Sequence, residues 1–218
     1  MSDKYRTFVY IDGHNLYNGI RRMYQSEDTS YDPNRWREVL WLDISKLAES
    51  FLNPTQELVK VKYFTARVKR PKSKVKRQSN YLDVLISLPK MQIIEGKFHD
   101  NNPVSCQHCG KEFYVSKEKQ TDVNLATELL VDAIENNFDT AYLVTADSDY
   151  RAPLEYIKHK FPQKRICMEF VETNFSGALK SLTYRTYIIN RQRLLNCQLP
   201  NSVTLPSGYV VNRPEKWK

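Results

Sequence analysis

Glycine and proline are scarce in this chain, which holds 6 Gly and 10 Pro among its 218 residues. That scarcity excludes collagen-like and low-complexity proteins, which need many of both. Hydrophobic residues make up 41% of the sequence, enough to bury a core rather than leave the chain disordered. The length fits one domain, or one domain with an appendage.

The chain also lacks a long apolar run. No stretch approaches the ~20 residues that span a bilayer, and the polar segment Met1–Arg6 has no apolar region of a secretory signal. Four cysteines without an export signal indicate a reducing compartment and no disulfide framework. We therefore expect a cytoplasmic protein with no membrane association.

Acidic residues are absent from Lys60 to Arg77, a segment that carries nine lysines and arginines. The net charge of the whole chain is +8, so the remainder is close to neutral. Such a local concentration is typical of a surface that binds a polyanion, and the alternative is a solvated, flexible loop. The candidate nucleic-acid-binding residues of this basic arm, residues 65–78, are Arg67, Lys69, Arg70, Lys72, Lys74, Lys76 and Arg77.

Apolar runs of strand length alternate with helical patterns along the chain. The runs are Thr7–Ile11, Leu58–Phe64, Gln92–Phe98, Thr140–Val144 and Arg165–Val171. This alternation predicts an α/β fold with a mostly parallel five-stranded sheet and helices on both faces. We expect one domain over residues 1–190, with the basic arm and a Cys-containing loop, 99–119, inserted in it. Residues 191–218 are expected to form a tail that packs on this domain.

The clearest helical pattern runs from Asp122 to Asn137. A second helical pattern, from Gln78 to Leu88, begins where the basic arm ends. In the first of these, Asp122 shares a face with apolar residues three and four positions apart. Asp132 and Glu128 fall away from that face. We therefore expect Asp122 at the edge of the buried stripe, and Asp132 and Glu128 in solvent.

Small acids stand where the apolar runs end. Asp12 follows the first run, Asp147 and Asp149 follow the fourth, and Asp122 opens a helix. Strand ends and helix starts of a parallel sheet converge on one crevice, so these carboxylates should meet there. Clustered carboxylates favour a hard cation such as Mg²⁺ or Mn²⁺.

Polar neighbours extend the same pattern. Asn15 is suited to orient a carboxylate or to donate to a phosphate, and Thr145 and Ser148 are suited to contact the metal or the phosphate. Each acid also has a structural alternative. Asp12 precedes glycine, as in many turns, and the other acids are suited to cap helices or to favour their first turns.

Three segments resemble the NYN-domain proteins of the PIN-like nuclease superfamily: YIDGHN at 10–15, KQTDVNLA at 119–126 and VTADSDY at 144–150. The resemblance implies a Rossmann-like PIN fold and Mg²⁺- or Mn²⁺-dependent endoribonuclease activity. The active-site positions that it implies are Asp12, Asn15, Asp122, Asp147 and Asp149. Ala146 stands where many relatives have glycine, a change that is tolerable unless the backbone there needs a positive φ.

The expected function is cleavage of a phosphodiester by a metal-activated water that leaves 5′-phosphate and 3′-hydroxyl ends. This chemistry does not separate RNA from DNA, and the family resemblance alone implies RNA, single-stranded or structured, as the substrate. One alternative is a non-catalytic RNA-binding module with a structural metal site. A phosphatase of the haloacid-dehalogenase type is less favoured, because His14 stands where that chemistry needs a second Asp. A dehydrogenase is excluded, since no G-x-G-x-x-G follows the first run.

A Cys-x-x-Cys-Gly turn in the 99–119 loop has the spacing of a zinc knuckle. Structural zinc takes four ligands. Cys106, Cys109 and His99 are the candidates within reach, and the fourth would come from the partner subunit or from water. The alternative is a pair of reduced thiols. PIN-like domains often form homodimers, and a zinc ion shared between subunits would favour one here.

Overall fold

The computed structural model describes residues 4–25, 35–100, 104–113, 116–172 and 174–218. Its central sheet has the strand order β6-β3-β2-β1-β7-β8-β9. The strands are β1 (Tyr5–Asp12), β2 (Gln56–Ala66), β3 (Met91–Asp100), β6 (Ser116–Lys119), β7 (Thr140–Val144), β8 (Arg165–Val171) and β9 (Arg185–Ile189). All neighbours are parallel except β3 and β6, which are antiparallel. The predicted α/β fold with a mostly parallel sheet is confirmed.

The sheet has six parallel strands in the described residues rather than the five expected. The additional strand, β9, is only partly buried along most of its length, so it lacks the continuous apolar run that marks the others. The added strand β6 is a run of charged residues at the opposite edge. Edge strands of this kind carry little hydrophobic signal in a sequence.

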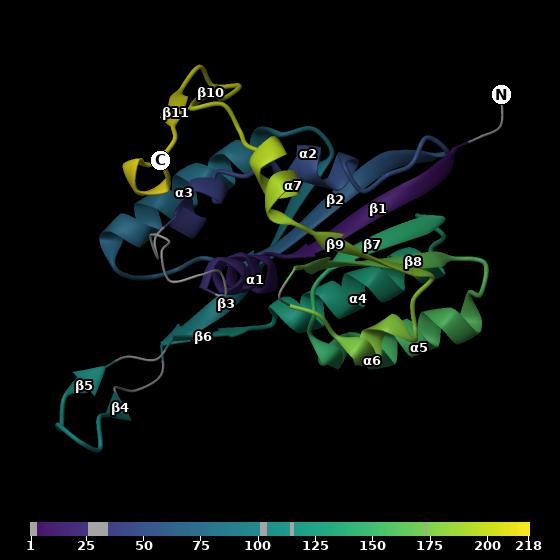
Figure 1. The fold of residues 1–218 in the computed structure, drawn as a ribbon, viewed down its shortest axis with the longest axis horizontal. Coiled ribbons are helices and arrows are strands. Elements are labelled where there is room, and N and C mark those ends of the chain that lie inside the picture. The colour runs from purple at the N-terminus through teal and green to yellow at the C-terminus, as the bar shows by residue number, and fades with distance from the viewer. Residues whose placement is uncertain (1–3, 26–34, 101–103, 114–115, 173) are drawn as a thin grey trace.

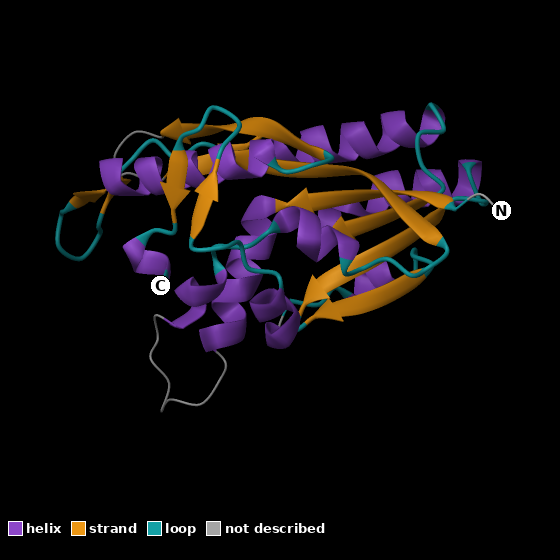
Figure 2. Cartoon of the chain, turned by 90° about the horizontal axis from the view of Figure 1, so that it is seen from above, coloured by secondary structure: helices purple, strands orange, loops and turns teal. Residues whose placement is uncertain are grey.

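Helices cover both faces of the sheet, as predicted (Figures 1 and 2). One hydrophobic cluster lies under α1 (Gly13–Gln25), η1 (Arg35–Val39), α2 (Ile44–Glu49), α3 (Lys72–Ser87) and α7 (Arg191–Asn196). The other lies under α4 (Thr121–Ile134), α5 (Arg151–Lys160) and α6 (Gly177–Lys180), and a short turn, η2 (Ser148–Tyr150), precedes α5. No helix in the described ranges is both long and apolar enough to cross a membrane.

The first strand forms the centre of both cores. Val9 and Ile11 are fully buried in one cluster, and Phe8 and Tyr10 alternate into the other. Because β1 lies between β2 and β7, its carboxyl end opens where α1 leaves the sheet and the loop after β7 begins. This edge is the crevice that parallel topology predicts for a ligand site.

Residues after α7 return across the first cluster. They form a hairpin, β10 (Ser202–Thr204) with β11 (Val210–Asn212), and a last turn, η3 (Glu215–Trp217). The Trp217 ring packs edge-on against the Tyr81 ring at 5.6 Å between centroids. The Trp41 indole N–H donates to the Pro200 carbonyl at 2.7 Å. The tail therefore contributes side chains to the surface beside α3.

The basic arm is not a loop over its full length. Thr65 and Ala66 belong to β2, and α3 begins at Lys72, six residues before the predicted start at Gln78. Pro71 has an extended backbone immediately before the helix, a position where its missing N–H costs nothing. The run of like charges hid this helical start, because exposed lysines carry no hydrophobic periodicity.

Candidate active site

A cavity of about 380 Å³ lies at the carboxyl end of β1 and collects three of the four predicted acids. Asp12 reaches it from the end of β1, Asp122 from the first turn of α4, and Asp147 from the loop after β7. The rest of the lining is polar or positive over most of its extent. It consists of His14, Asn15, Asn18, Arg22, Phe98, Lys119 and Thr121.

Asp12 is the most buried of these acids, with 4% of its surface exposed. Its carboxylate accepts the Asn15 backbone N–H at 2.9 Å, so it also caps α1, and it accepts the Thr145 hydroxyl at 3.3 Å. Gly13 follows because a Cβ there would lie 2.6 Å from the Tyr63 ring and 2.8 Å from the Phe64 carbonyl oxygen. The Asp-Gly pair thus joins a strand directly to a helix under close packing, and it is not a loose turn.

The Asn15 side chain links α1 to the loop after β7 and to the segment after β8 by hydrogen bonds. Its amide oxygen accepts the Ala146 backbone N–H at 3.2 Å and the Asn174 amide at 2.8 Å. This geometry anchors the loop that carries Asp147 to the first turn of α1. Asn174 lies after β8 and has no motif around it, so the sequence alone offered no signal for this contact.

The loop after β7 holds its own acids by local hydrogen bonds. The Asp147 backbone N–H donates to the buried Thr145 hydroxyl at 3.2 Å, and the Asp147 carboxylate accepts the Asp149 N–H at 3.0 Å. Asp149 and Ser148 are exposed and do not line the cavity. Ala146 is not among the residues with positive φ in the described chain, so a methyl group is accommodated there.

Tyr150 is a member of this site that sequence reasoning missed. Its side chain is buried, and its hydroxyl donates to the Asp122 carboxylate at 3.1 Å. Burial raises the pKa of this phenol, and the negative charges of Asp12, Asp122 and Asp147 raise it further. The three carboxylates therefore act on one hydroxyl, which stays protonated and serves as a donor.

Two features fix the start of α4, where Asp122 lies. Gln120 takes a left-handed backbone with φ of 75° just before the helix. A Cβ at Gly96 would lie 2.4 Å from the Thr121 hydroxyl, so only glycine in β3 lets the helix approach this closely. Asp122 itself is exposed, at the mouth of the cavity.

The donor set suits a hard divalent cation in its chemistry. Carboxylate and amide oxygens are the ligands that Mg²⁺ and Mn²⁺ prefer, and three negative side chains on one cavity repel one another without a cation. Within the described residues, no three His, Cys, Asp or Glu side chains are grouped tightly enough to form a ready-made metal site. The residues therefore fit a divalent cation in the type of their donor atoms and in lining one cavity.

The prediction that Asp132 is solvated is wrong. Asp132 is 4% exposed and accepts the Tyr10 hydroxyl at 2.6 Å and the Lys62 ammonium group, which also binds Glu128 at 2.6 Å. Asp132 follows Leu125 and Leu129 along the buried side of α4. A helical pattern counts an acid as outward-facing, and nothing in it shows that a lysine of β2 lies opposite.

The basic arm divides in the structure. Lys74 and Arg77 line a second cavity, described below, whereas Arg67 binds Glu95 at 2.8 Å. The remaining four, Lys69, Arg70, Lys72 and Lys76, are exposed.

Cys106 and Cys109 lie on a hairpin of β4 (Val104–Ser105) and β5 (Glu112–Phe113) that projects from the body (Figure 1). Both are free thiols. Hydrogen bonds from the backbone N–H groups of His108 and Cys109 lower the pKa of Cys106, as in a turn built to hold a thiolate. The side chain of His99, the predicted third ligand, lies outside the described residues, so the zinc hypothesis is not tested.

Comparison with known proteins gives a family and a fold. The NYN domain family model matches residues 6–189. A curated relative, 6-hydroxy-3-succinoylpyridine 3-monooxygenase HspA of Pseudomonas putida, is 29% identical over 99% of this chain and 76% of its own length. A solved structure of a protein of unknown function from Vibrio parahaemolyticus is similar with a TM-score of 0.57 and 17% identity, covering 88% of this chain and 96% of that one.

Proposed function

Because the chain belongs to the NYN-domain family, a family of PIN-like nucleases, we propose that it is a divalent-metal-dependent endoribonuclease. The observation that carries this proposal is the shared cavity, where Asp12, Asp122 and Asp147 arrive from three separate elements. Chemistry on a phosphodiester needs an activated water and stabilisation of charge on two oxygens, which a divalent ion supplies when bound. Asp149 is exposed and its backbone N–H donates to the Asp147 carboxylate, and it is proposed to support the same cluster.

Each residue of the site has a proposed part. Asp12, Asp122 and Asp147 would hold the ion, and the protonated Tyr150 hydroxyl keeps Asp122 turned toward the cavity. Asn15 holds the Asp147 loop in place through the Ala146 backbone.

The cavity also carries positive charge. Lys119 and Arg22 line it together with the three acids, and they are suited to bind the phosphate oxygens of an RNA strand. Thr145 acts through its hydrogen bonds to Asp12 and Asp147, and Ser148, exposed beside them, is proposed to contact the RNA backbone.

The decisive comparison sets Asp147→Asn against Glu57→Gln. Both exchange an acid for its amide, but Glu57 is exposed at the amino end of β2, the opposite edge of the sheet. End-labelled RNA and matched DNA are incubated with each protein in Mn²⁺, in Mg²⁺ and in EDTA. We expect wild type and Glu57→Gln to cut RNA only with metal, and Asp147→Asn not to cut.

Three results would decide against this function. Cleavage that survives in Asp147→Asn or in EDTA, or products with 2′,3′-cyclic phosphate ends, would contradict a metal-dependent hydrolysis. RNA binding without cleavage under every metal condition would favour the alternative, an RNA-binding module that keeps the acids as a structural site.

The Pseudomonas relative supports a second candidate, oxygenation of a small aromatic acid. The observation in its favour is a larger cavity beside the acids, about 600 Å³, lined by aromatic and positive side chains. A monooxygenase needs O₂ and a reductant. Oxygen uptake that depends on 6-hydroxy-3-succinoylpyridine, measured with reduced nicotinamide and flavin supplied, would support this candidate, and no uptake would remove it.

The cysteine hairpin is proposed to supply half of a zinc site, completed by ligands from a second copy of the chain. Its support is the Cys106 turn and its projection away from the body. Zinc content by mass spectrometry and mass by light scattering test this in wild type and Cys106→Ser. We expect about one zinc per two chains and a dimer that a chelator dissociates. Zinc-free wild-type protein would contradict the proposal.

A further inference from the structure

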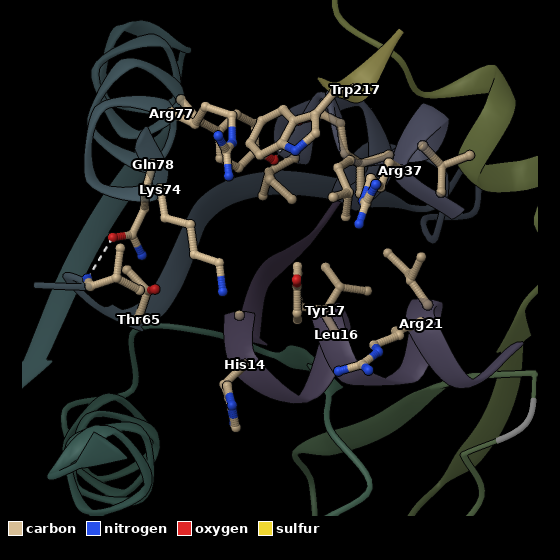
Figure 3. Close-up of a pocket in the computed structure, with 18 of the residues that line it drawn as sticks. His14, Leu16, Tyr17, Arg21, Arg37, Thr65, Lys74, Arg77, Gln78 and Trp217 are labelled. Carbon is tan, nitrogen blue, oxygen red and sulfur yellow. Dashed lines mark hydrogen bonds between the residues drawn. The ribbon is translucent and has the colours of Figure 1, made fainter. Parts of the chain in front are cut away.

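The second cavity lies between α1, η1, α3 and the last turn of the chain, η3 (Figure 3). Its volume is about 600 Å³, within the range of small-ligand pockets. His14 and Phe98 line both this cavity and the acidic one, so the two adjoin. A ligand that occupied both cavities would therefore contact these two residues.

Besides Lys216 of η3, positive side chains from three further elements line this cavity. Arg21 comes from α1, Arg37 from η1, and Lys74 and Arg77 from one face of α3, three residues apart. In Figure 3 the charged ends of Lys74, Arg77 and Arg37 point into the open space. No Asp or Glu of the described residues lines the cavity, and within that part of the chain these four cations form no ion pair with an acid.

The pKa of the Tyr17 hydroxyl shows that three of the positive side chains lie near one point. Burial raises the pKa of this phenol, while Arg21, Arg37 and Arg77 each act to lower it. Three guanidinium groups thus act on one point in the wall. Such an arrangement is unfavourable without an anion to offset the repulsion, so the cavity is suited to an anionic ligand.

Flat aromatic surfaces form much of the remaining wall. The Tyr17 ring, 41% exposed, stands edge-on to the Trp36 ring at 5.3 Å between centroids and an angle of 82°. Trp217 closes another side, held against Tyr81. Rings placed beside cations that pair with no acid in the described part of the chain suit a ligand that is both planar and anionic.

We propose that this cavity binds one nucleotide of a single-stranded RNA whose adjoining phosphodiester lies in the acidic cavity. The base would stack on the Tyr17 and Trp217 rings, and its phosphate would be bound by Arg77 and Lys74. This inference deepens the proposed nuclease function by naming how the substrate is held.

Two observations favour an RNA strand over a small aromatic acid. The cavity shares His14 and Phe98 with the acidic one, and only a ligand longer than one small acid would reach both cavities. Beside it, the exposed Lys69, Lys72 and Lys76 extend the positive surface beyond the reach of one small molecule. A polyanion contacts all of these at once.

The test measures binding in EDTA, so that it does not depend on cleavage. A labelled 12-nucleotide single-stranded RNA is titrated by anisotropy with wild type, with the double variant Lys74→Gln/Arg77→Gln, and with Lys160→Gln. Lys160 is an exposed cation on α5, across the sheet from the cavity. We expect the double variant to weaken binding at least tenfold and Lys160→Gln to leave it within twofold.

The salt dependence gives a second readout. Loss of the one phosphate that Lys74 and Arg77 bind together should reduce the slope of log K against log[salt] by roughly 0.7 for a single strand. Stacking is tested separately with Tyr17→Ala, expected to weaken binding severalfold, and Tyr17→Phe, expected to keep it because the ring remains. Thermal unfolding of each variant checks that the fold is retained.

Failure of this inference differs from failure of the nuclease function. If the double variant binds RNA as tightly as wild type with an unchanged salt slope, the cavity does not hold RNA, even where cleavage occurs. If cleavage never occurs but the double variant loses binding as expected, this inference stands and the nuclease function fails. Displacement of the RNA by benzoate but not by AMP would assign the cavity to small aromatic acids and overturn the inference.

Discussion

The two adjoining cavities have opposite charge and different construction. The acidic one is built from the ends of the sheet, where Asp12 and Asp147 are fixed by hydrogen bonds to neighbouring backbone. The positive one is built from surface helices and the end of the chain, and its cations have no acid partner within the described residues. A rigid acidic site suits chemistry, and longer positive side chains suit binding of a flexible polyanion. We therefore assign the chemistry to the acidic cavity and the binding of the strand to the positive cavity, with His14 lining both.

The strongest challenge to this division is Asp12→Asn. It removes a charge from the acidic cavity while keeping an oxygen that can accept the Asn15 N–H. We expect the cleavage rate to fall at least a thousandfold, about 4 kcal/mol in activation free energy. RNA affinity in EDTA should stay the same or rise, because one repulsive charge is gone. A parallel loss of binding would show that the two cavities do not divide the tasks.

The acids on α4 provide a second contrast, since Asp122 lines the cavity and Asp132 is buried beside Lys62. Lys62→Met would leave the Asp132 and Glu128 carboxylates without their cation. We expect a loss of about 3 kcal/mol or more in the free energy of unfolding, measured by denaturant titration. Asp122→Asn should change stability by less than about 0.5 kcal/mol. Equal destabilisation by the two would contradict the distinction.

Glu169 supplies an acid outside both cavities, and it isolates pH effects on stability from those on activity. It is buried in β8 beside Arg193, and burial raises its pKa to about 8. The folded protein then keeps a proton that the unfolded chain loses above its ordinary pKa, so stability falls as the pH rises toward 8. The slope approaches about 1.4 kcal/mol per pH unit at its steepest.

Glu169→Gln should flatten this pH dependence, because the amide does not titrate. Thermal unfolding from pH 5 to pH 8.5 measures the difference between the variant and wild type. The RNA affinity at pH 7 should be the same for both. A stability profile unchanged by the substitution would mean that Glu169 is ionised throughout this range.

The smallest expected effect concerns the tail. Trp217→Ala removes one wall of the positive cavity and its contact with Tyr81. We expect RNA binding to weaken severalfold, about 1 kcal/mol, while the cleavage rate at saturating RNA stays the same. The two constants are separated by single-turnover kinetics over a range of protein concentrations. A lower rate at saturation would extend the role of the tail to the acidic cavity.

Much of the fold was predictable from sequence because buried parallel strands are continuous apolar runs. The acids that line the cavity were also predictable, since Asp12 and Asp147 directly follow such runs and Asp122 opens a helix. Contacts between distant side chains were not predictable. Tyr150 closes the VTADSDY segment, but nothing in that segment shows that its hydroxyl reaches Asp122, and Asn174, which contacts Asn15, lies in no motif.

The positive cavity illustrates the same limit. Lys74 and Arg77 were singled out by charge, but their partners in the wall come from α1, η1 and the last turn. The prediction that Asp132 is solvated is wrong for a related reason, because Lys62, which binds it, lies on a strand 70 positions earlier in the chain. Pairing between residues far apart in sequence is a property of topology, and a single sequence does not display it.

The central position of β1 has a consequence during synthesis of the chain. Its neighbour β7 pairs with it in a register that joins Thr7 to Thr140, and Asp12 meets Thr145 across 133 positions. A growing polypeptide therefore holds its first acid long before its partners exist, and the site cannot assemble until that late strand has left the ribosome. If the finished protein cuts RNA as proposed, this order of synthesis would keep the unfinished chain from cutting the messenger RNA from which it is being translated.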